Sequence, residues 1–509
     1  MGFLNAMQNE LLEDFNESVT ENGAVGYRTS GKNLLDLNFA VASLRSAPEE
    51  EIVHRFRSAY FDDKLLAMRW LFFARDVRGG LGERRLFRAA MKFVAAYDPD
   101  CAVKVIPIIA EYGRFDDLLC LLDNEKVSGA VLHLIGEQFR TDCERHLRGE
   151  PISLLAKWLP SINASSAETK RYAKIICKHL GVSEKSYRHM LGTLRNHLDV
   201  VERKMSEKRW GDINYETVPS RANLIYNGAF LRNDEKRRRE FLSKLENGEA
   251  KINASVLYPH DIVHKYSDGW YSSVKEYDAA IEAMWKSLPD TVQGAGNTIV
   301  VADGSGSMRV NVGDSSVTAL EVANALAIYF AEHSSGEFKD KYITFSSRPQ
   351  LVDFGWAKSL RDKLQIALRH NEVSNTNIEA VFDLILKTAK KNDLRQDEIP
   401  ANVLIISDME FDRAACSNGG YGFSEKLFKQ IEKRYADAGY KLPRLVFWNV
   451  NSRTNTIPVR ENEIGVALVS GFSVNICKMV MSGKTDPYEC LLETIKSERY
   501  DPVEYLLGL

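Results

Sequence analysis

The 509-residue sequence lacks the cysteine pairs that would indicate a disulfide framework or a zinc module. Its seven cysteines are an odd, scattered set, and no two of them are spaced as C-x-x-C. Reduced thiols in the cytoplasm are the simplest interpretation of that pattern. No run comes near the roughly 18 consecutive apolar residues that a membrane span requires. The opening residues, MGFLNAMQNELLEDF, also lack the basic segment of a secretion signal. We therefore expect a cytoplasmic protein that does not enter a membrane.

A large charge imbalance is also missing. Lys and Arg number 67 and Asp and Glu number 70, a net charge of −3, and 44% of residues are apolar, as in ordinary globular proteins. Charge is uneven locally, because residues 151–250 hold 19 Lys and Arg against 12 Asp and Glu, whereas residues 301–509 hold 25 against 28. The basic segment predicts either a solvated helical surface or an anion-binding face, for which RNA is the first candidate.

Between about residues 34 and 285, apolar residues recur at spacings of three and four, the period of an amphipathic helix. KLLAMRWLFFAR (64–75) and ERRLFRAAMKFVAAY (83–97) are examples, and the glycine pair at 79–80 separates them. The helices are short, numerous and consecutive. We therefore predict an all-α array of stacked, HEAT-like helix pairs over residues 31–290, after an N-terminal extension at residues 1–30.

The pattern changes near residue 297, where short β-branched runs begin to alternate with helices. The predicted strands are TIVVA (298–302), YITF (342–345), LVDF (351–354), NVLIIS (402–407), RLVFWNV (444–450) and GVALVS (465–470). Alternation of strands with helices of ten or more residues predicts βαβ units and a doubly wound, mostly parallel, Rossmann-like sheet. We place this second domain at residues 297–509.

A cluster of oxygen ligands directly follows the first predicted strand. VADGSGSM (301–308) places Asp303, Ser305 and Ser307 at alternate positions, with glycines between them that allow a tight turn. The carboxyl ends of strands are where open α/β sheets bind ligands. One carboxylate and two hydroxyls are hard, mostly neutral ligands, which suit Mg²⁺. Mn²⁺ and Ca²⁺ are alternatives.

Two more oxygen ligands follow other predicted elements. Thr376 lies in a loop just before a helix, and Asp408 ends the strand NVLIIS. The sheet topology brings such positions together, so we predict one metal site from Asp303, Ser305, Ser307, Thr376 and Asp408. The alternative is that the three hydroxyl residues merely cap helices.

These residues resemble the metal-ion-dependent adhesion site of von Willebrand factor type A domains, which takes D-x-S-x-S, a Thr and an Asp from three loops. The loop around Thr376 reads Ser-Asn-Thr where that family has Gly-Gly-Thr. The resemblance implies a bound ion with one open position, to which a protein partner supplies an acidic residue.

The helical half is similar to another family. LFFARDVRGGLGERRLFRAAMKF (71–93) and IPIIAEYGRFDDLL (106–119) look like the start of the helical-repeat, TROVE-type module of the Ro autoantigen. WGDINYETVPSRANLIYNGAFLRND (210–234) is similar to an uncharacterised family of Ro relatives. Ro-type proteins join a ring of helical repeats to a von Willebrand A domain and bind RNA, so the resemblance implies a ribonucleoprotein component.

Two basic groups are the candidate RNA contacts, since Arg binds phosphate through paired hydrogen bonds. The first group surrounds the glycine-rich turn at 78–82, and the second is a run of four charges. Their members are Arg75, Arg78, Arg84, Arg85 and Arg88, and Lys236, Arg237, Arg238 and Arg239. Local salt bridges with Asp76 and Glu83, for the first group, and an exposed helix, for the second, are the alternatives.

No catalytic motif is visible. The sequence has no phosphate loop, no H-E-x-x-H and no serine in a G-x-S-x-G elbow, so we predict that the protein is not an enzyme and hydrolyses neither nucleoside triphosphates nor peptides. His260 and His264 are four residues apart, but no third ligand accompanies them. An RNA-binding Ro-like protein with a metal site is the leading hypothesis. A protein-interaction scaffold without RNA is the second, and a metal-assisted nuclease the third.

Overall fold

The computed structural model describes residues 16–19, 25–267, 273–292, 297–313, 315–371, 377–410, 425–454, 456–457, 466–473 and 486–508. The chain divides into two compact units. The helical unit comprises residues 52–256 and 496–509, and the α/β unit comprises residues 1–51 and 257–495. Within the described ranges, every helix is too short or too polar to cross a membrane.

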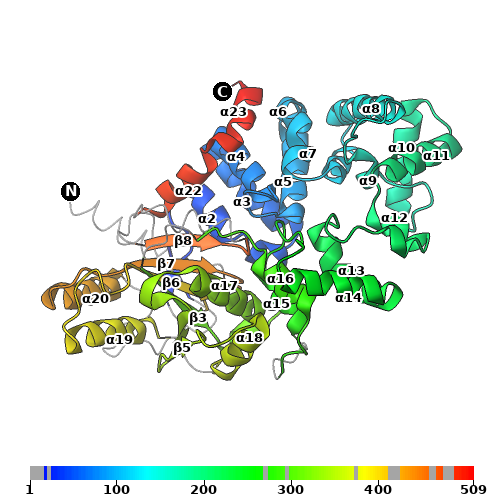
Figure 1. Ribbon diagram of the computed structural model, residues 1–509. Coiled ribbons are helices and arrows are strands. Elements are labelled where there is room, and N and C mark those ends of the chain that lie inside the picture. The colour runs from blue at the N-terminus through cyan, green and yellow to red at the C-terminus, as the bar shows by residue number, and fades with distance from the viewer. Residues whose placement is uncertain are drawn as a thin grey trace, which may run out of the picture. The chain divides into compact units, whose positions relative to one another are not determined.

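Short helices joined by tight turns make up the helical unit (Figure 1). Neighbours in sequence pack against each other, as α4 does with α5, α5 with α6, α10 with α11 and α13 with α14. The α-helices are α3 (Glu49–Asp62), α4 (Lys64–Arg75), α5 (Arg84–Tyr97), α6 (Pro99–Val105), α7 (Ile109–Tyr112), α8 (Glu125–Leu147), α9 (Leu155–Trp158), α10 (Ala167–Leu180), α11 (Glu184–His197), α12 (Val201–Ser206), α13 (Ser220–Asn233), α14 (Glu235–Glu246) and α23 (Asp501–Leu507).

Local signals explain where these helices begin and end. Asp63 caps α4 by accepting a hydrogen bond from the Leu66 amide, and Ser166 caps α10 in the same way. Helix α10 ends at Gly181, whose φ of 67° is a left-handed conformation that glycine adopts without steric cost. Helix α5 buries its apolar face, from Leu86 to Ala95, within the unit.

The end of the chain belongs to the helical unit through buried polar contacts. Asp76 is fully buried and accepts hydrogen bonds from the Arg499 guanidinium, at 2.8 Å, and the Tyr500 hydroxyl, at 3.2 Å. Arg69, also buried, donates to Asp501 at 2.8 Å. The sequence boundaries predicted the C-terminal residues as part of the second domain. The structure divides the chain differently, because these charged pairs join positions more than 400 residues apart.

The α/β unit contains a six-stranded sheet and the helices that pack against it (Figure 1). Its strands are β3 (Thr298–Asp303), β4 (Lys341–Phe345), β5 (Leu351–Asp353), β6 (Asn402–Ser407), β7 (Arg444–Asn449) and β8 (Val466–Ser470), and a separate hairpin consists of β1 (Glu17–Val19) and β2 (Val25–Tyr27). Its α-helices are α2 (Asn33–Phe39), α15 (Pro259–Tyr266), α16 (Ala279–Lys286), α17 (Ala319–His333), α18 (Leu360–Arg369), α19 (Ile378–Lys391), α20 (Glu425–Asp437) and α22 (Pro487–Ile495).

The strand order is β5-β4-β3-β6-β7-β8, and only β5 is antiparallel to its neighbour. Strands β3, β6, β7 and β8 are almost wholly buried apolar runs, as parallel strands with both faces covered must be. Helix α17 packs across β3, β4 and β6. The predicted fold class, an all-α region followed by a mostly parallel sheet with helices, is confirmed.

The remaining departures lie at the edges of this unit. Residues 1–51 and 257–290 were assigned to the extension and the helical array, but α2 packs on β8 and α15 packs on α17. Both helices bury apolar residues there, for example Leu35 on α2 and Val263 on α15. A helical period indicates that a face is buried, but it does not indicate against which element.

Candidate metal centre

The strand order places the candidate site at a recognisable point of the sheet. The strand that follows β3 in the sequence, β4, pairs with one edge of β3. The other edge of β3 pairs with β6, which begins the second half of the sheet. In parallel α/β sheets the crevice at the carboxyl ends of two such strands is where ligands bind. Asp303 is the last residue of β3, and Asp408 directly follows β6. The two carboxylates predicted from separate loops are therefore neighbours.

Asp303 is held in place by serine and backbone donors. The Ser407 hydroxyl donates to its Oδ2 at 2.6 Å, and the Ser305 amide donates to its Oδ1 at 2.9 Å. The hydroxyls of Ser305 and Ser307 are 2.9 Å apart. Asp303 is 2% exposed, so its carboxylate lies at the bottom of the loop rather than in solvent. Three of the five predicted ligands are thus brought together.

Asp408 is a buried carboxylate that is poorly compensated. It is 1% exposed, its Oδ1 accepts a hydrogen bond of 3.2 Å from the Glu410 amide, and a hydrogen bond from the Ser307 hydroxyl also stabilises its charge. Its Oδ2 accepts none from the described residues, and the nearest cationic group, the Arg453 guanidinium, is 3.6 Å away. Burial, and then the negative charge of Asp303, raise the pKa of Asp408 to about 7.

These observations fit a divalent cation. A buried acceptor without a donor costs about 1–3 kcal/mol, and more when it is charged. A cation between the two carboxylates would supply the missing charge. The described residues contain no group of three or more His, Cys, Asp and Glu side chains suited to a metal, so the serine hydroxyls must complete any ligand set. Oxygen-only donors favour Mg²⁺, Mn²⁺ or Ca²⁺ over Zn²⁺.

Backbone conformation positions both loops. Met409, next to Asp408, has a φ of 63°, an uncommon conformation for a residue other than glycine and one that is concentrated at functional sites. A Cβ atom on Gly304 would lie 3.0 Å from the Asn371 Cα. Glycine between the ligands therefore lets Asn371, the last described residue before Thr376, approach the Asp303 loop.

Thr376 itself lies outside the described residues. The helix that follows it, α19, is capped by Asn377, whose side chain accepts a hydrogen bond from the Ala380 amide at 3.0 Å. Ser305 stands at the N-cap position of a short 3₁₀ helix, Gly306–Arg309, but its side chain makes no capping hydrogen bond. The capping alternative therefore does not describe Ser305, and Thr376 as a ligand remains a prediction.

Glu410 shapes a neighbouring loop. Its Oε1 accepts hydrogen bonds from the backbone amides of Arg453 at 2.7 Å and Thr454 at 2.9 Å. The Thr454 hydroxyl donates to the same carboxylate. These donors tie the segment after β6 to the segment after β7 and thereby place the Arg453 guanidinium near Asp408.

The predicted basic group around the glycine-rich turn is largely paired within the helical unit. Arg75 is 2% exposed and forms an ion pair of 2.7 Å with Asp117, which is fully buried. Arg88 also pairs with Asp117, and Arg78 donates to the Glu111 carbonyl. Arg75 is therefore not available to a phosphate. The partners of Arg75 and Arg88 are Asp116 and Asp117 rather than Asp76 and Glu83.

Arg84 differs from its neighbours. It is exposed and has neither an ion pair nor a hydrogen bond with the described residues. Desolvation, and then the positive charges of Arg114 and Arg88, lower its pKa. Arg85 is half-buried.

The run from Lys236 to Arg239 divides in the same way. Arg238 is fully buried, Arg237 donates to the carbonyls of Trp210 and Ile213, and Arg239 pairs with Glu235 at 2.8 Å. Lys236 is exposed and pairs with no described residue. A groove beside the run is lined by both signs of charge, Asp212, Glu216 and Glu240 with Arg237 and Lys244. The run is therefore not the continuous basic surface that its sequence suggests.

Comparisons with known proteins relate both halves to families without an assigned function. Residues 297–502 match a domain of unknown function (DUF7788), and residues 20–125 and 178–298 match another (DUF2828). An uncharacterised protein of Acanthamoeba polyphaga mimivirus is 28% identical over 533 residues, covering 96% of this chain and 89% of the viral protein. The crystal structure of the Ro (RSR) protein of Deinococcus radiodurans is similar with a TM-score of 0.47 and 13% identity, covering 84% of this chain and 93% of that one.

The structure also contains a polar arrangement that sequence reasoning missed. The Ser316 hydroxyl lies 3.0 Å from Nε2 of His264, and Nδ1 of His264 lies 3.0 Å from Oε1 of Glu321. His264 was singled out only for its spacing from His260. Ser316 and Glu321 had no motif, because the three residues come from different elements of the α/β unit.

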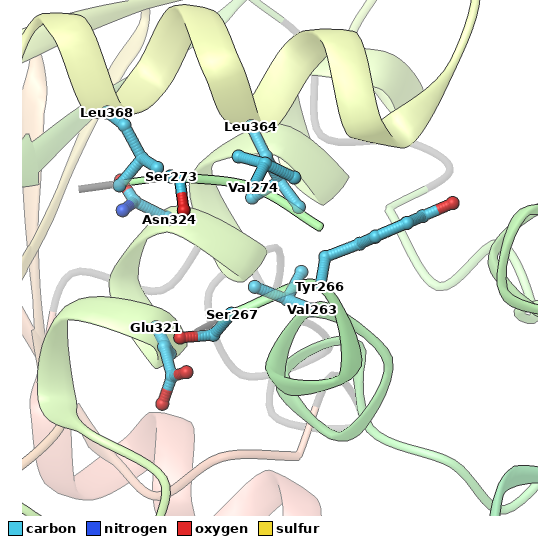
Figure 2. Close-up of a pocket in the computed structure, with 9 residues that line it drawn as sticks. All are labelled: Val263, Tyr266, Ser267, Ser273, Val274, Glu321, Asn324, Leu364 and Leu368. Carbon is cyan, nitrogen blue, oxygen red and sulfur yellow. The ribbon is translucent and has the colours of Figure 1, made fainter. Parts of the chain in front are cut away.

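A small pocket lies beside Glu321, between α15, α17 and α18 (Figure 2). Its volume is about 30 Å³. Leu364, Leu368, Val263 and Val274 make most of its wall apolar, while Asn324, Ser267 and Glu321 contribute polar groups (Figure 2). None of the predicted metal ligands lines it.

Proposed function

We propose that this chain is a binding protein whose α/β unit holds a divalent cation, Mg²⁺ in the first place, through Asp303, Ser305, Ser307 and Asp408. Thr376 is the fifth candidate ligand. The observation that supports this most directly is the Asp408 carboxylate, buried beside Asp303 with one oxygen that accepts no hydrogen bond from the described residues. Two negative charges at the ligand-binding edge of the sheet, with hydroxyls between them, form an incomplete electrostatic arrangement that a cation would complete.

The bound ion would bind a carboxylate of a protein partner. Mg²⁺ requires near-octahedral geometry and keeps water where protein ligands are absent, so an ion held beside the half-buried Ser305 and Ser307 would retain exchangeable positions. The resemblance of the D-x-S-x-S loop to the adhesion site of von Willebrand A domains supports the same role. The partner would therefore present an aspartate or glutamate to the ion.

Mn²⁺ tests both the cation site and the binding of a carboxylate by the ion, because protein-bound Mn²⁺ enhances the relaxation of water protons. We expect enhancement with the wild-type protein and none with Asp303→Ala. Acetate, the simplest carboxylate, should lower the enhancement as it replaces bound water. Loss of the signal on adding excess Mg²⁺ would show that the two ions share the site. Enhancement that persists in Asp303→Ala would contradict the site, and indifference to acetate would contradict the role of the ion in carboxylate binding.

RNA binding by the helical unit is a second candidate function. Residues 151–250 carry a net charge of +7, and Arg84 and Lys236 are exposed without an ion pair to any described residue. Arg84 lies near the positive charges of Arg114 and Arg88, which Asp116 and Asp117 offset in part, and its own guanidinium is the exposed charge that an anion would meet. The Ro resemblance of the helical half supports RNA as that anion.

Replacing both Arg84 and Lys236 by Gln should weaken RNA binding and reduce its dependence on salt. Each bound phosphate releases counterions, so the slope of log affinity against log salt should fall by about one unit for each phosphate that the variant no longer binds. A gel-shift titration of a small structured RNA over several salt concentrations measures both quantities.

Arg239→Gln is the matched control, because Arg239 is exposed but already paired with Glu235. It should change the slope less than the double variant does. A dissociation constant weaker than about 10⁻⁴ M near physiological salt would correspond to weak non-specific binding and would reject this second function.

A further inference from the structure

Ser316, His264 and Glu321 form a chain of hydrogen-bonding groups in the α/β unit. Ser316 lies in the loop that precedes α17, His264 lies on α15, and Glu321 lies in the first turn of α17. The two links, Ser316 Oγ to His264 Nε2 and His264 Nδ1 to Glu321 Oε1, are both 3.0 Å. A hydroxyl, an imidazole and a carboxylate in this order are the components of an activated nucleophile.

The carboxylate is rigidly placed. Glu321 is 5% exposed, and its second oxygen accepts hydrogen bonds from the Thr318 amide at 2.8 Å and the Thr318 hydroxyl at 3.3 Å. The Thr318 hydroxyl in turn accepts from the Glu321 amide and closes a capping box at the start of α17. Figure 2 shows the Ser267 hydroxyl close to the same side chain.

The carboxylate also determines which histidine nitrogen carries the proton. Burial alone would raise the pKa of Glu321, but hydrogen bonds from His264, the Thr318 amide and Ser267 outweigh burial and lower it. An ionised Glu321 accepts a hydrogen bond from the Nδ1–H group of His264, so neutral His264 has its lone pair on Nε2. That nitrogen faces Ser316 and can accept the hydroxyl proton.

We propose that Ser316 is a reactive serine, with His264 as its general base and Glu321 as the residue that positions the base, and that it transfers acyl groups from small carboxylic esters. Ser316 is exposed, so a soluble ester reaches its hydroxyl. The Ser316 amide donates no hydrogen bond to the described residues and is one donor for the oxyanion of the tetrahedral intermediate.

The reaction balances without a cofactor. Ser316 Oγ attacks the acyl carbon while its proton passes to His264 Nε2. The ester C–O bond then breaks, and the leaving alkoxide takes that proton and departs as the alcohol. A water molecule, deprotonated by His264, attacks the acyl–serine ester and releases the carboxylic acid, which restores the Ser316 hydroxyl.

This inference is independent of the metal site, since none of its residues is a predicted metal ligand. It departs from the expectation that the protein has no catalytic constellation, but not from the expected lack of nucleotide and peptide hydrolysis. A short activated ester needs less stabilisation than a peptide bond, which suits a site with one identified oxyanion donor.

A fluorophosphonate probe tests the serine directly, because it reacts with serines activated by a neighbouring base. We expect covalent labelling of the full-length wild-type chain, mapped to Ser316 by peptide mass spectrometry, and release of nitrophenol from p-nitrophenyl acetate. Ser316→Ala should abolish both, and His264→Gln should lower both at least 100-fold. Ser335→Ala, which changes another exposed serine of the same unit, should leave both unchanged.

The positioning role of Glu321 needs a separate readout, since Glu321 also caps α17. Glu321→Gln should slow labelling. In ¹⁵N spectra of histidine-labelled protein, neutral His264 should carry its proton on Nδ1 in the wild type and should be a mixture of the Nδ1-H and Nε2-H tautomers in the variant. A melting temperature within a few degrees of the wild type excludes unfolding as the cause. Labelling that is absent from Ser316, or equal in His264→Gln, would overturn the proposal.

Discussion

Millimolar Mg²⁺ should raise the melting temperature of the α/β unit and should not do so in Asp303→Ala. An ion that binds only the folded state stabilises it by about 2.7 kcal/mol at 100 times its dissociation constant. For a unit of this size, that corresponds to roughly 4–5 °C. Calorimetric scans with Mg²⁺ and with EDTA measure the difference, and Glu337→Gln, an exposed carboxylate elsewhere in the unit, is the matched control.

Asp408→Asn should stabilise the metal-free protein and should remove the further stabilisation that Mg²⁺ gives the wild type. Without metal, the variant should be more stable than the wild type, because it removes one of two neighbouring buried carboxylates. The raised pKa of Asp408 means that its charged form is disfavoured in the folded protein, by about 1.4 kcal/mol per pKa unit. We expect a gain on the order of 2 kcal/mol in EDTA and little or no gain from Mg²⁺.

If Asp408 has a purely structural role, Asp408→Asn should instead lower the stability of the metal-free protein. If Asp408→Asn destabilises the metal-free protein, the two carboxylates are compensated in some other way. If the variant still gains stability from Mg²⁺ as the wild type does, Asp408 is not a ligand. Either result would remove the main support for the cation site.

Arg238→Ala should destabilise the helical unit strongly, whereas Arg239→Ala should be almost silent. The Arg238 guanidinium donates to Asn227 at 2.9 and 3.1 Å and to Asn223 at 3.2 Å. It also lies within 5.3 Å of three ring centres, those of Tyr215, Phe230 and Phe241. Truncation leaves a cavity and buried amides without donors, which together cost about 3 kcal/mol or more.

Its neighbour is an internal control with the same charge. Arg239 forms an exposed i,i+4 pair with Glu235, and such a pair contributes about 0.5 kcal/mol or less. Urea unfolding followed by circular dichroism compares the two variants. Equal free energies of unfolding would show that the Arg238 side chain is not buried. A large loss of stability in Arg238→Ala would also mean that replacing all four charges together cannot test RNA binding, since it would unfold the unit.

Much of the α/β unit was predictable from the residues alone. Buried parallel strands are short apolar runs, and each of the six predicted strands is present within a residue or two of its expected bounds. The strand pattern also predicts that Asp303 and Asp408 lie together, because the carboxyl ends of adjacent parallel strands lie at one edge. The electrostatic state of Asp408 could not be predicted, since burial and the distance to Arg453 depend on how the loops pack.

The basic residues show most clearly what could not be predicted from the sequence. Arg75, Arg84, Arg238 and Lys236 look alike in a sequence, yet two are buried in polar networks and two are exposed. Their partners lie on other elements, as Asp117 does for Arg75 and Asn227 for Arg238, and follow no local period. Hydrophobic periodicity records which side of an element faces inward, but the pairing of charges depends on contacts between distant segments.

The sequence by itself determined the two structural classes, the strands of the sheet and the D-x-S-x-S loop at its ligand-binding edge, because these follow from local periodicity and from the chirality of βαβ connections. Only the tertiary structure decided that the last residues join the helical unit and which arginines remain exposed. It alone placed Ser316 against His264 and Glu321. The physical reason is that burial and hydrogen bonding between side chains are properties of the packed chain, and no segment carries them alone.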